Sequence, residues 1–312
     1  MPNKRSIRVF APATIGNVSC GFDILGMAVE KPGDEVVMSL SDKKGIHITS
    51  ITGDQGKLPH DASKNTAGIA IRSFLDHIGS DRGIEFELHK KMPIGSGLGS
   101  SAASAVAGVF AVNELLDTPL KREDLLPFAI VAEEATSGNI HADNVAPSLI
   151  GGLVLIKSYE PLKIKSIPLP ADLHITLVYP HVEILTRDAR NILPKTFPLE
   201  TGVKQWSNVA ALISAAYEND IDGMGNALTD HIAEPYRSKL IPHFDRAKQT
   251  AMESGACGFG ISGSGPTLFS FSDSEKTSVK IGQMIESLYN KNNIDTSVYL
   301  SRINNKGAEI IE

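Results

Sequence analysis

The stretch that most constrains this chain runs from Pro93 to Ala103 and reads Pro-Ile-Gly-Ser-Gly-Leu-Gly-Ser-Ser-Ala-Ala. Its three glycines alternate with small or apolar residues, and an apolar run through Ala111 follows. The segment before it, residues 83–89, alternates apolar and polar side chains, which is typical of a strand. The sequence therefore predicts a strand, a glycine-rich turn and a helix in immediate succession.

Such a junction is suited to binding phosphate. Glycines let the backbone turn its N–H groups inward, and the start of a helix adds unpaired N–H groups and positive partial charge. Ser100 and Ser101 could cap the helix or coordinate the metal ion of a nucleotide. The alternative is a tight turn that only opens a buried, alanine-rich helix. A Walker P-loop is excluded, because no lysine follows the glycines.

Length and composition limit the classes of protein that the chain can belong to. With 312 residues it predicts two domains, and its net charge of −6 argues against non-specific nucleic-acid binding. It has two cysteines, Cys20 and Cys257, and neither a signal-peptide core nor an apolar run of membrane-spanning length. We therefore expect a cytoplasmic protein that binds neither membranes nor nucleic acid.

Two further glycine-containing segments are candidates for ligand-binding loops. Residues 12–26 are predicted to form an irregular loop in which Asn17 and Asp23 stand among apolar residues. Residues 258–263 have the spacing Gly-x-Gly-x-x-Gly, but Pro266 and a predicted strand follow them. A dinucleotide site requires a helix at that point, so a dinucleotide-dependent oxidoreductase is excluded and a strand–loop–strand is predicted.

Several polar residues could be either structural or functional. Residues 139–148 hold four polar side chains within six positions, among them His141, Asp143 and Asn144, and form either a turn or a site. No second histidine lies at zinc-ligand spacing from His141. Glu133 and Glu134 end a predicted helix, where carboxylates are usually solvated but can also bind a metal ion.

The second half of the chain predicts an α+β domain. Pro168 and Pro170 mark the expected junction, which gives domains of residues 1–168 and 169–312. Beyond the junction, strands and helices alternate in an order typical of a ferredoxin-like layer. Arg190 and Arg237 lie in this half, in a short basic helix and a polar turn, where surface arginines would be unremarkable.

Three segments, residues 11–23, 93–103 and 260–269, together resemble the GHMP kinases, which include galactokinase and mevalonate kinase. Residues 141–147, 189–194 and 234–242 resemble the members of that family that act on L-homoserine. The resemblance implies transfer of phosphate from ATP to L-homoserine in threonine biosynthesis. It also implies a homodimer and a two-domain α+β fold, with an N-terminal ribosomal-protein-S5-like domain and a ferredoxin-like C-terminal domain.

The resemblance also assigns roles to individual residues. The ATP-binding loop would consist of Pro93, Ile94, Gly95, Ser96, Gly97, Leu98, Gly99, Ser100, Ser101, Ala102 and Ala103. Ser101 and Glu133 would bind Mg²⁺, with Glu134 as the adjacent alternative. The acceptor would be bound by Asn17, Asp23, His141, Asp143, Asn144, Arg190 and Arg237.

The chemistry of the acceptor agrees with these residue types. A guanidinium fork can pair bidentately with the homoserine carboxylate, which suits Arg190 and Arg237. Asp23 or Asp143 suits the ammonium group, and Asn144 or Asn17 suits the hydroxyl. We expect catalysis by positioning and charge neutralisation without an obligatory base, while leaving open whether Asp143 or Asn144 faces the hydroxyl. A kinase for mevalonate or shikimate, or a nucleotide-binding protein without turnover, remains an alternative.

Overall fold

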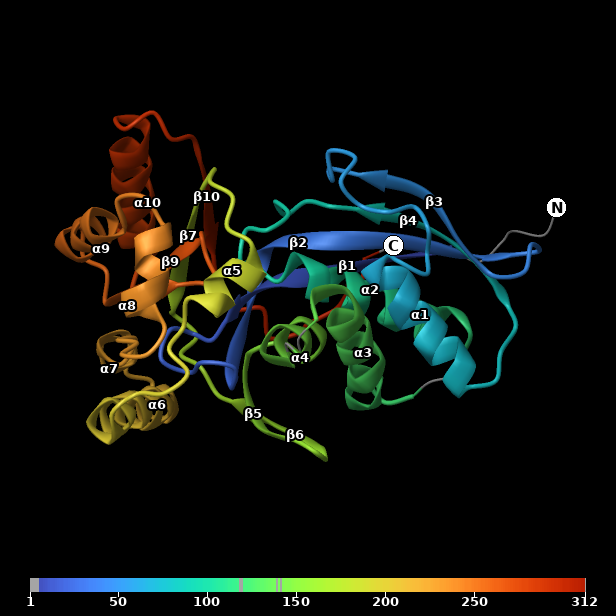
Figure 1. The fold of residues 1–312 in the computed structure, drawn as a ribbon, viewed down its shortest axis with the longest axis horizontal. Coiled ribbons are helices and arrows are strands. Elements are labelled where there is room, and N and C mark those ends of the chain that lie inside the picture. The colour runs from blue at the N-terminus through green and yellow to red at the C-terminus, as the bar shows by residue number, and fades with distance from the viewer. Residues whose placement is uncertain (1–5, 118–119, 139, 141, 312) are drawn as a thin grey trace.

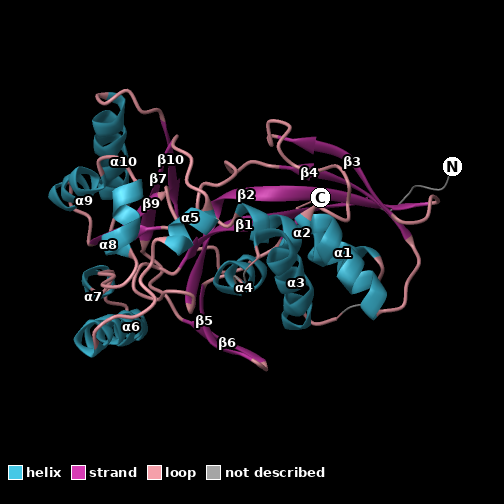
Figure 2. Ribbon diagram, viewed as in Figure 1, coloured by secondary structure: helices cyan, strands magenta, loops and turns pink. Residues whose placement is uncertain are grey.

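The computed structural model describes residues 6–117, 120–138, 140 and 142–311. Figure 1 shows two parts along the long axis of the molecule, the first 170 or so residues on one side and most of the remainder on the other. Each part is built on its own β-sheet, and helices pack against both sheets (Figure 2). The α+β class and the two-domain organisation of the prediction are thus confirmed.

The larger sheet has seven strands within the described residues and is mainly antiparallel. Its central strands follow the order β11-β1-β2-β4-β3, and β5 and β6 extend it from the start of β2. The strands are β1 (Ser6–Gly16), β2 (Leu25–Ser41), β3 (Ile46–Thr52), β4 (Gly83–His89), β5 (Leu153–Tyr159), β6 (Leu162–Ile167) and β11 (Glu309–Ile310).

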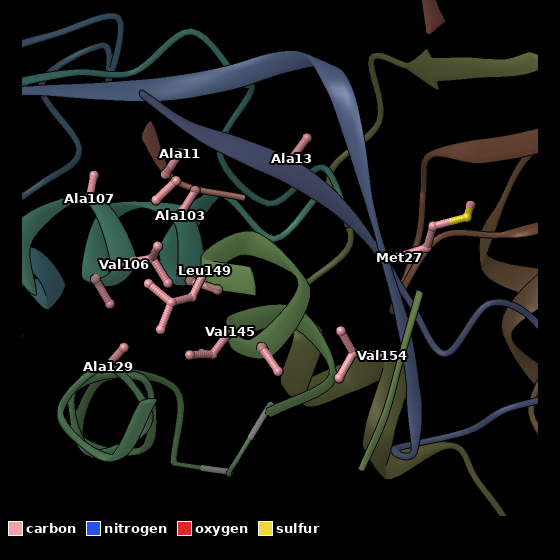
Figure 3. Packing of buried hydrophobic residues seen from close by; sticks show 14 of the residues in the cluster. Ala11, Ala13, Met27, Ala103, Val106, Ala107, Ala129, Val145, Leu149 and Val154 are labelled. Carbon is pink, nitrogen blue, oxygen red and sulfur yellow. The ribbon is translucent and has the colours of Figure 1, made fainter. Parts of the chain in front are cut away.

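Four helices cover one face of this sheet: α1 (Thr66–His77), α2 (Ser100–Leu115), α3 (Leu126–Ser137) and α4 (Ala142–Ile150). A 3₁₀ turn, η1 (Arg122–Leu125), precedes α3. Helix α2 lies at the centre and is buried on nearly all sides, as its uniformly apolar sequence predicts. Small side chains such as Ala103 and Ala107 let the neighbouring helices and β1 approach it closely (Figure 3).

The smaller sheet contains β7 (His174–Pro180), β8 (Gly258–Ile261), β9 (Leu268–Ser272) and β10 (Thr296–Ser301) in the antiparallel order β10-β7-β9-β8. With helices after the first and third of these strands, this is the strand order 4-1-3-2 of the predicted ferredoxin-like layer. The helical segments are α5 (Thr186–Asn191), α6 (Leu199–Glu218), α7 (Ile221–Asn226), α8 (Glu234–Arg237), η2 (Ser238–Leu240), α9 (Phe244–Glu253) and α10 (Glu275–Asn290).

The two sheets share apolar packing. Leu177 and Phe269 of the smaller sheet belong to the same buried cluster as Val29 of β2. After β10 the chain returns to the larger sheet, where Ile303 bridges Val29 and β11 pairs with β1. The boundary at residue 168 stays a prediction, and the last residues of the chain pack with the first domain.

Two local predictions were wrong. Residues 12–16 belong to β1 instead of the predicted loop, because they pair with β2 as far as Gly26. Residues 142–150 form helix α4, although Pro147 lies inside it. Strand β3 pairs in parallel with β4, to which the chain crosses over through α1. None of the helices that the structure describes is long and apolar enough to cross a membrane.

Candidate active site

A cavity of about 380 Å³ lies between the glycine-rich loop, α4 and the loops of the smaller sheet. It brings together most of the predicted site residues: Asn17, Asp23, Ile94, Gly95, Ser96, Gly97, Gly99, Ser100, Ser101, Glu133, Asp143, Asn144, Arg190 and Arg237. Pro93, Leu98, Ala102 and Ala103 support the loop but do not line this cavity. His141 was also predicted here, but it lies outside the described residues.

The glycine-rich loop has the backbone that a phosphate site requires. Gly95, Gly97 and Gly99 adopt positive φ angles of 71°, 80° and 69°. No side chain caps the start of α2 at Gly99, so the first N–H groups of the helix remain available to a ligand. Ser96 is buried, and its hydroxyl has no hydrogen-bond partner among the described residues. The loop therefore offers donors and a helix N-terminus to an anion.

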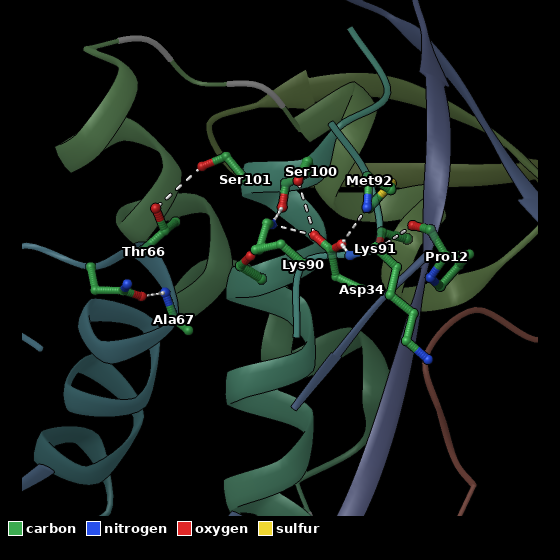
Figure 4. A network of polar contacts seen from close by, with 12 residues as sticks. Pro12, Asp34, Thr66, Ala67, Lys90, Lys91, Met92, Ser100 and Ser101 are labelled. Carbon is green, nitrogen blue, oxygen red and sulfur yellow. Dashed lines mark hydrogen bonds and ion pairs between the residues drawn. The ribbon is translucent and has the colours of Figure 1, made fainter. Parts of the chain in front are cut away.

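A buried ion pair fixes this loop to the sheet (Figure 4). The Lys90 ammonium contacts the Asp34 carboxylate and donates to the Ser100 carbonyl at 2.8 Å and the Ser104 hydroxyl at 2.7 Å. Asp34 also accepts bonds from the Ser100 hydroxyl and from the N–H groups of Lys91 and Met92. The charge of Lys90 is thus neutralised inside the protein, and the start of α2 is held in place.

The predicted metal ligands lie where three helices meet. The Ser101 hydroxyl is 3.2 Å from the Thr66 hydroxyl at the start of α1, and Thr66 also contacts Thr136 of α3 at 3.3 Å. Burial raises the pKa of Glu133, while a hydrogen bond with Ser101 and the charge of Lys90 oppose the shift. Glu133 lines the cavity, whereas the adjacent Glu134 is exposed and does not.

This donor set fits Mg²⁺ bound together with a nucleotide. Magnesium commonly takes one or two protein oxygens and fills its other positions with water and phosphate oxygens. One carboxylate and one hydroxyl next to the glycine-rich loop, called the phosphate loop from here on, match that pattern. No group of three or more His, Cys, Asp or Glu side chains arranged for a metal ion occurs among the described residues. The site thus suits a metal ion that arrives with its phosphates.

Asp143 and Asn144 start helix α4 and face the cavity. Asp143 is 2% exposed, and its Oδ2 accepts the Asn17 N–H at 3.2 Å. Burial, and then the nearby charge of Asp23, raise the pKa of Asp143 to about 7, against the opposing effects of the Asn17 N–H and Arg190. Its Oδ1 is buried and makes no hydrogen bond to the described residues, so it can accept a bond from a ligand.

The Asn144 side chain is held by close neighbours. The Thr14 hydroxyl donates to Asn144 Oδ1 at 2.8 Å. A Cβ atom added at Gly16 would come within 2.8 Å of Asn144 Nδ2, and one added at Gly99 would come within 3.0 Å of Oδ1. Glycine at both positions therefore allows this amide to pack between β1 and the phosphate loop. Asn144 is neutral and cannot act as a base.

The arginines predicted to bind the acceptor lie together at one end of the cavity. Arg190 Nη2 donates to both carboxylate oxygens of Asp23, at 2.9 and 2.8 Å. Arg237 is only 5% exposed, which rules out a surface arginine, and it donates to the carbonyls of Ala189 at 3.2 Å and Gly263 at 2.7 Å. Both guanidinium groups lie over the Phe22 ring, at 5.7 and 5.2 Å.

The loop that carries Asn17 has an unusual backbone. Asn17, Val18 and Ser19 all have positive φ angles, of 66°, 42° and 58°. This conformation is strained for a β-branched valine and persists only where the surroundings enforce it. Here the Asn17 side chain accepts the Asp23 N–H at 2.9 Å and donates to the Gly263 carbonyl at 3.0 Å. The strained turn thus places Asn17 and Asp23 at the cavity.

Sequence reasoning missed several residues of this site. Asp34 and Lys90 are 56 positions apart, and no local pattern links them. Thr14, which orients Asn144, was assigned to a loop. Further lining residues that were not predicted are Leu58, Pro59, Lys64, Asn65, Thr66, Leu88, Lys90, Ser104, Thr136, Thr186, Gly263 and Ser264.

Comparisons with known proteins agree on one family. Residues 65–152 match the GHMP kinases N terminal domain, and residues 212–291 match the GHMP kinases C terminal family. A homoserine kinase of Chlorobaculum tepidum is 44% identical over 98% of this chain and 98% of its own. A homoserine kinase of Pyrococcus abyssi is 38% identical over 86% of this chain and 88% of its own.

Solved structures give the same answer. The crystal structure of homoserine kinase from Cytophaga hutchinsonii is 54% identical, covers 100% of this chain and 99% of its own, and superimposes with a TM-score of 0.97. L. major mevalonate kinase in complex with R-mevalonate is 16% identical over 96% of both chains, with a TM-score of 0.75, and shares the fold. The chain belongs to the homoserine kinases of the GHMP kinase family.

Proposed function

We propose that this protein transfers the γ-phosphoryl group of ATP to the side-chain hydroxyl of L-homoserine, giving O-phospho-L-homoserine for threonine biosynthesis. The observation that carries this is a single cavity that joins two kinds of site. One end is a glycine-rich loop with an uncapped helix N-terminus, and the other holds two arginines and two aspartates. The first suits a triphosphate and the second a zwitterionic amino acid.

ATP would bind along the glycine-rich loop. Its phosphates would accept bonds from the loop N–H groups and from the first turn of α2. The cavity continues past the loop to Leu58, Pro59, Leu88 and Ile94, an apolar wall that suits a nucleotide base. Lys90 is neutralised by Asp34, so its charge is not available to the phosphates, and a metal cation would supply positive charge beside them.

Ser101 and Glu133 would hold that cation, Mg²⁺. The ion would neutralise charge that develops on the transferred group. Glu133 is the ligand in this proposal and Glu134 is not, because only Glu133 borders the cavity. Burial raises the pKa of Glu133, and a divalent cation bound beside it would favour the charged carboxylate.

L-Homoserine would bind between the arginines and α4. Arg190 and Arg237 would pair with its carboxylate, while Asp23 and Asp143 would surround its ammonium group. When homoserine binds, Arg190 would exchange its contact with Asp23 for the substrate carboxylate, and Asp23 would pair with the substrate ammonium group. Each charge would then keep a partner of opposite sign. Asn144, held by Thr14, would orient the hydroxyl toward the γ-phosphate. We propose that transfer proceeds by this positioning without an obligatory base.

A coupled ADP-release assay with Mg²⁺ and ATP tests the function. The acceptors are L-homoserine, L-serine, mevalonate and shikimate, beside a control without acceptor. Strong preference for homoserine is expected, because mevalonate and shikimate have no ammonium group for Asp23 and Asp143. Turnover with one of those acids instead would contradict the acceptor assignment, and no turnover with any acceptor by folded protein would contradict the activity.

We also propose a cytoplasmic homodimer, on the strength of the family resemblance. Cys20 and Cys257 are free thiols, as expected in a reducing compartment. Light scattering after size-exclusion chromatography measures the mass in solution, and a monomer at micromolar concentration would contradict the dimer.

A further inference from the structure

The hairpin loop between β8 and β9 contacts both halves of the active site. On the phosphate side, the Ser262 hydroxyl donates to the Gly97 carbonyl at 2.7 Å, and the Thr267 N–H donates to the Ser96 carbonyl at 3.1 Å. On the acceptor side, the Gly263 carbonyl accepts bonds from Asn17 and Arg237. The segment from Ser262 to Gly263 therefore lies between the two substrate positions.

The contact with the phosphate loop is direct. A Cβ atom added at Gly97 would meet the carbonyl oxygens of Ser262 and Gly265 at 2.5 and 2.8 Å, so only glycine allows this approach. The Ser262 side chain is 0% exposed, and its hydroxyl also lies 3.5 Å from the Thr14 carbonyl. Thr14 in turn orients Asn144. One buried hydroxyl thus touches the phosphate loop and the strand that supports the acceptor pocket.

We propose that Ser262 is a positioning residue that fixes the phosphate loop relative to the acceptor pocket. It acts through the Gly97 carbonyl and the adjacent Gly263, without touching either substrate. The inference rests on the proposed function, in which ATP lies on the loop and homoserine lies beside Arg237. Arg237 lies in helix α8 and the phosphate loop lies between β4 and α2, and two consecutive residues of the hairpin, Ser262 and Gly263, contact both.

The physical reason lies in the geometry of phosphoryl transfer. The acceptor oxygen must approach the phosphorus in line, and a displacement of about 1 Å can cost about 10²-fold in rate. The protein binds each substrate with its own groups, so loosening the link between the two sites leaves both affinities nearly intact. The rate of transfer should fall, because the acceptor oxygen and the phosphorus are no longer held at the distance that transfer requires.

Ser262→Ala tests this inference, with Ser270→Ala as the matched control. Ser270 is in the same hairpin, is 1% exposed, and has a hydroxyl without a hydrogen-bond partner among the described residues. We expect Ser262→Ala to lower kcat by roughly 10- to 100-fold. The dissociation constants of a non-hydrolysable ATP analogue and of homoserine, each measured alone by calorimetry, should change by less than about threefold, on the order of 0.6 kcal/mol. Ser270→Ala should leave kcat unchanged.

A second readout is the coupling between the substrates. If the hairpin fixes the geometry of one binding site relative to the other, bound homoserine should increase the affinity of the wild type for the ATP analogue. In Ser262→Ala, homoserine should no longer change that affinity. A kcat of Ser262→Ala within twofold of the wild type would overturn the inference. A proportional loss of both affinities together with stability would also overturn it, because that pattern indicates a purely structural role.

Hydrogen–deuterium exchange of the unmodified protein tests the link if Ser262→Ala does not fold. Homoserine alone should slow exchange in the peptide that contains residues 95–99, and unchanged exchange there would contradict the inference. The wild-type assay separates this inference from the function. A wild type that does not phosphorylate homoserine overturns the proposed function, whereas an active wild type with an equally active Ser262→Ala overturns only the role of Ser262.

Discussion

At the scale of single residues, the two carboxylates that face the cavity differ in their surroundings. Asp23 is paired with Arg190, whereas Asp143 is buried and accepts the N–H of Asn17. Its pKa of about 7 leaves Asp143 partly protonated at neutral pH, and an ammonium group bound beside it would favour the charged form. Asp143 can therefore serve as a counter-ion for the substrate ammonium group without removing the proton of the substrate hydroxyl.

Asp143→Asn separates these roles. We expect KM for homoserine to rise, because the ammonium group loses an anionic partner, and kcat to fall by less than about tenfold, since transfer needs no base. Steady-state kinetics measure both. If affinity is retained while kcat falls by about 10²–10⁴-fold, Asp143 acts as a general base and the positioning mechanism is wrong.

The same variant tests the raised pKa of Asp143. In the wild type without ligands, the folded state keeps a proton that the unfolded state releases above about pH 4, so the Asp143 contribution to the free energy of unfolding falls as pH rises toward and past 7. An asparagine carries no such charge. The stability of Asp143→Asn relative to the wild type should therefore increase between pH 5 and pH 8 in urea unfolding, and a pH-independent difference would contradict the shift.

Arg237→Lys tests the carboxylate pocket. The guanidinium group already holds the Ala189 and Gly263 carbonyls, and a single ammonium cannot hold both and pair with a substrate carboxylate. KM for homoserine should rise by a factor that corresponds to a loss of about 1.5–3 kcal/mol in binding free energy, and KM for ATP should change less. The exposed Arg187→Lys serves as control, and an unchanged homoserine KM in Arg237→Lys would remove Arg237 from the pocket.

Glu133→Gln and Glu134→Gln form a matched pair for the metal site. Loss of the buried carboxylate should raise the Mg²⁺ concentration needed for half-maximal activity by about tenfold or more, while Glu134→Gln should behave as the wild type. Calorimetric titration of Mg²⁺ with an ATP analogue gives a readout without turnover. Equal effects of the two substitutions would contradict the choice of Glu133.

At the scale of elements, the position of α2 depends on the ion pair between Lys90 and Asp34, which lies beneath the phosphate loop. Removing one partner of a buried, hydrogen-bonded pair leaves the other charge uncompensated. Lys90→Met should therefore lower the free energy of unfolding by about 3–5 kcal/mol, measured by urea denaturation. Lys44→Met, which breaks an exposed pair with Asp81, should have little effect. Equal effects of the two substitutions would contradict a buried anchor.

The sequence predicted elements where a local pattern determines the structure. The apolar run of α2 and the alternation of β4 are visible within a short window. Helix α4 was missed, because its polar start and Pro147 resemble a turn, and packing of Val145 and Leu149 in the core stabilises it instead. Pairing of β3 with β4 depends on a crossover through α1 and has no local signal.

The site was predicted through a family resemblance. That resemblance identified residues that line the cavity, but it did not identify the residues that hold them in place. Asn17, Glu133 and Arg237 border the cavity, and their binding roles stay predictions. Asp34, Thr14 and Ser262 act on those residues or on the loop from positions far away in the sequence. Their chemistry, a carboxylate and two hydroxyls, is common throughout the chain and becomes informative only when the fold brings them together.

At the scale of the whole molecule, the last residues of the chain connect its two parts. Asn304 exchanges backbone bonds with Ala28 and Gly152, and its side chain accepts the N–H groups of Lys306 and Gly307. Asn304→Ala should cost roughly 1–3 kcal/mol of unfolding free energy, because buried N–H groups lose their acceptor. The exposed Asn290→Ala is the control in the same urea titration, and equal stability of the two variants would contradict this role.

The return of β11 to β1 has a consequence for how the protein is made. Strand β1 leaves the ribosome long before β11, so the edge of β1 that pairs with β11 stays open until β11 has emerged. A nascent chain that stops near residue 168 has that edge exposed. The N-terminal domain should thus reach its final protection against hydrogen exchange only after β11 has been made, so the larger sheet is completed after all strands of the smaller sheet have been synthesised.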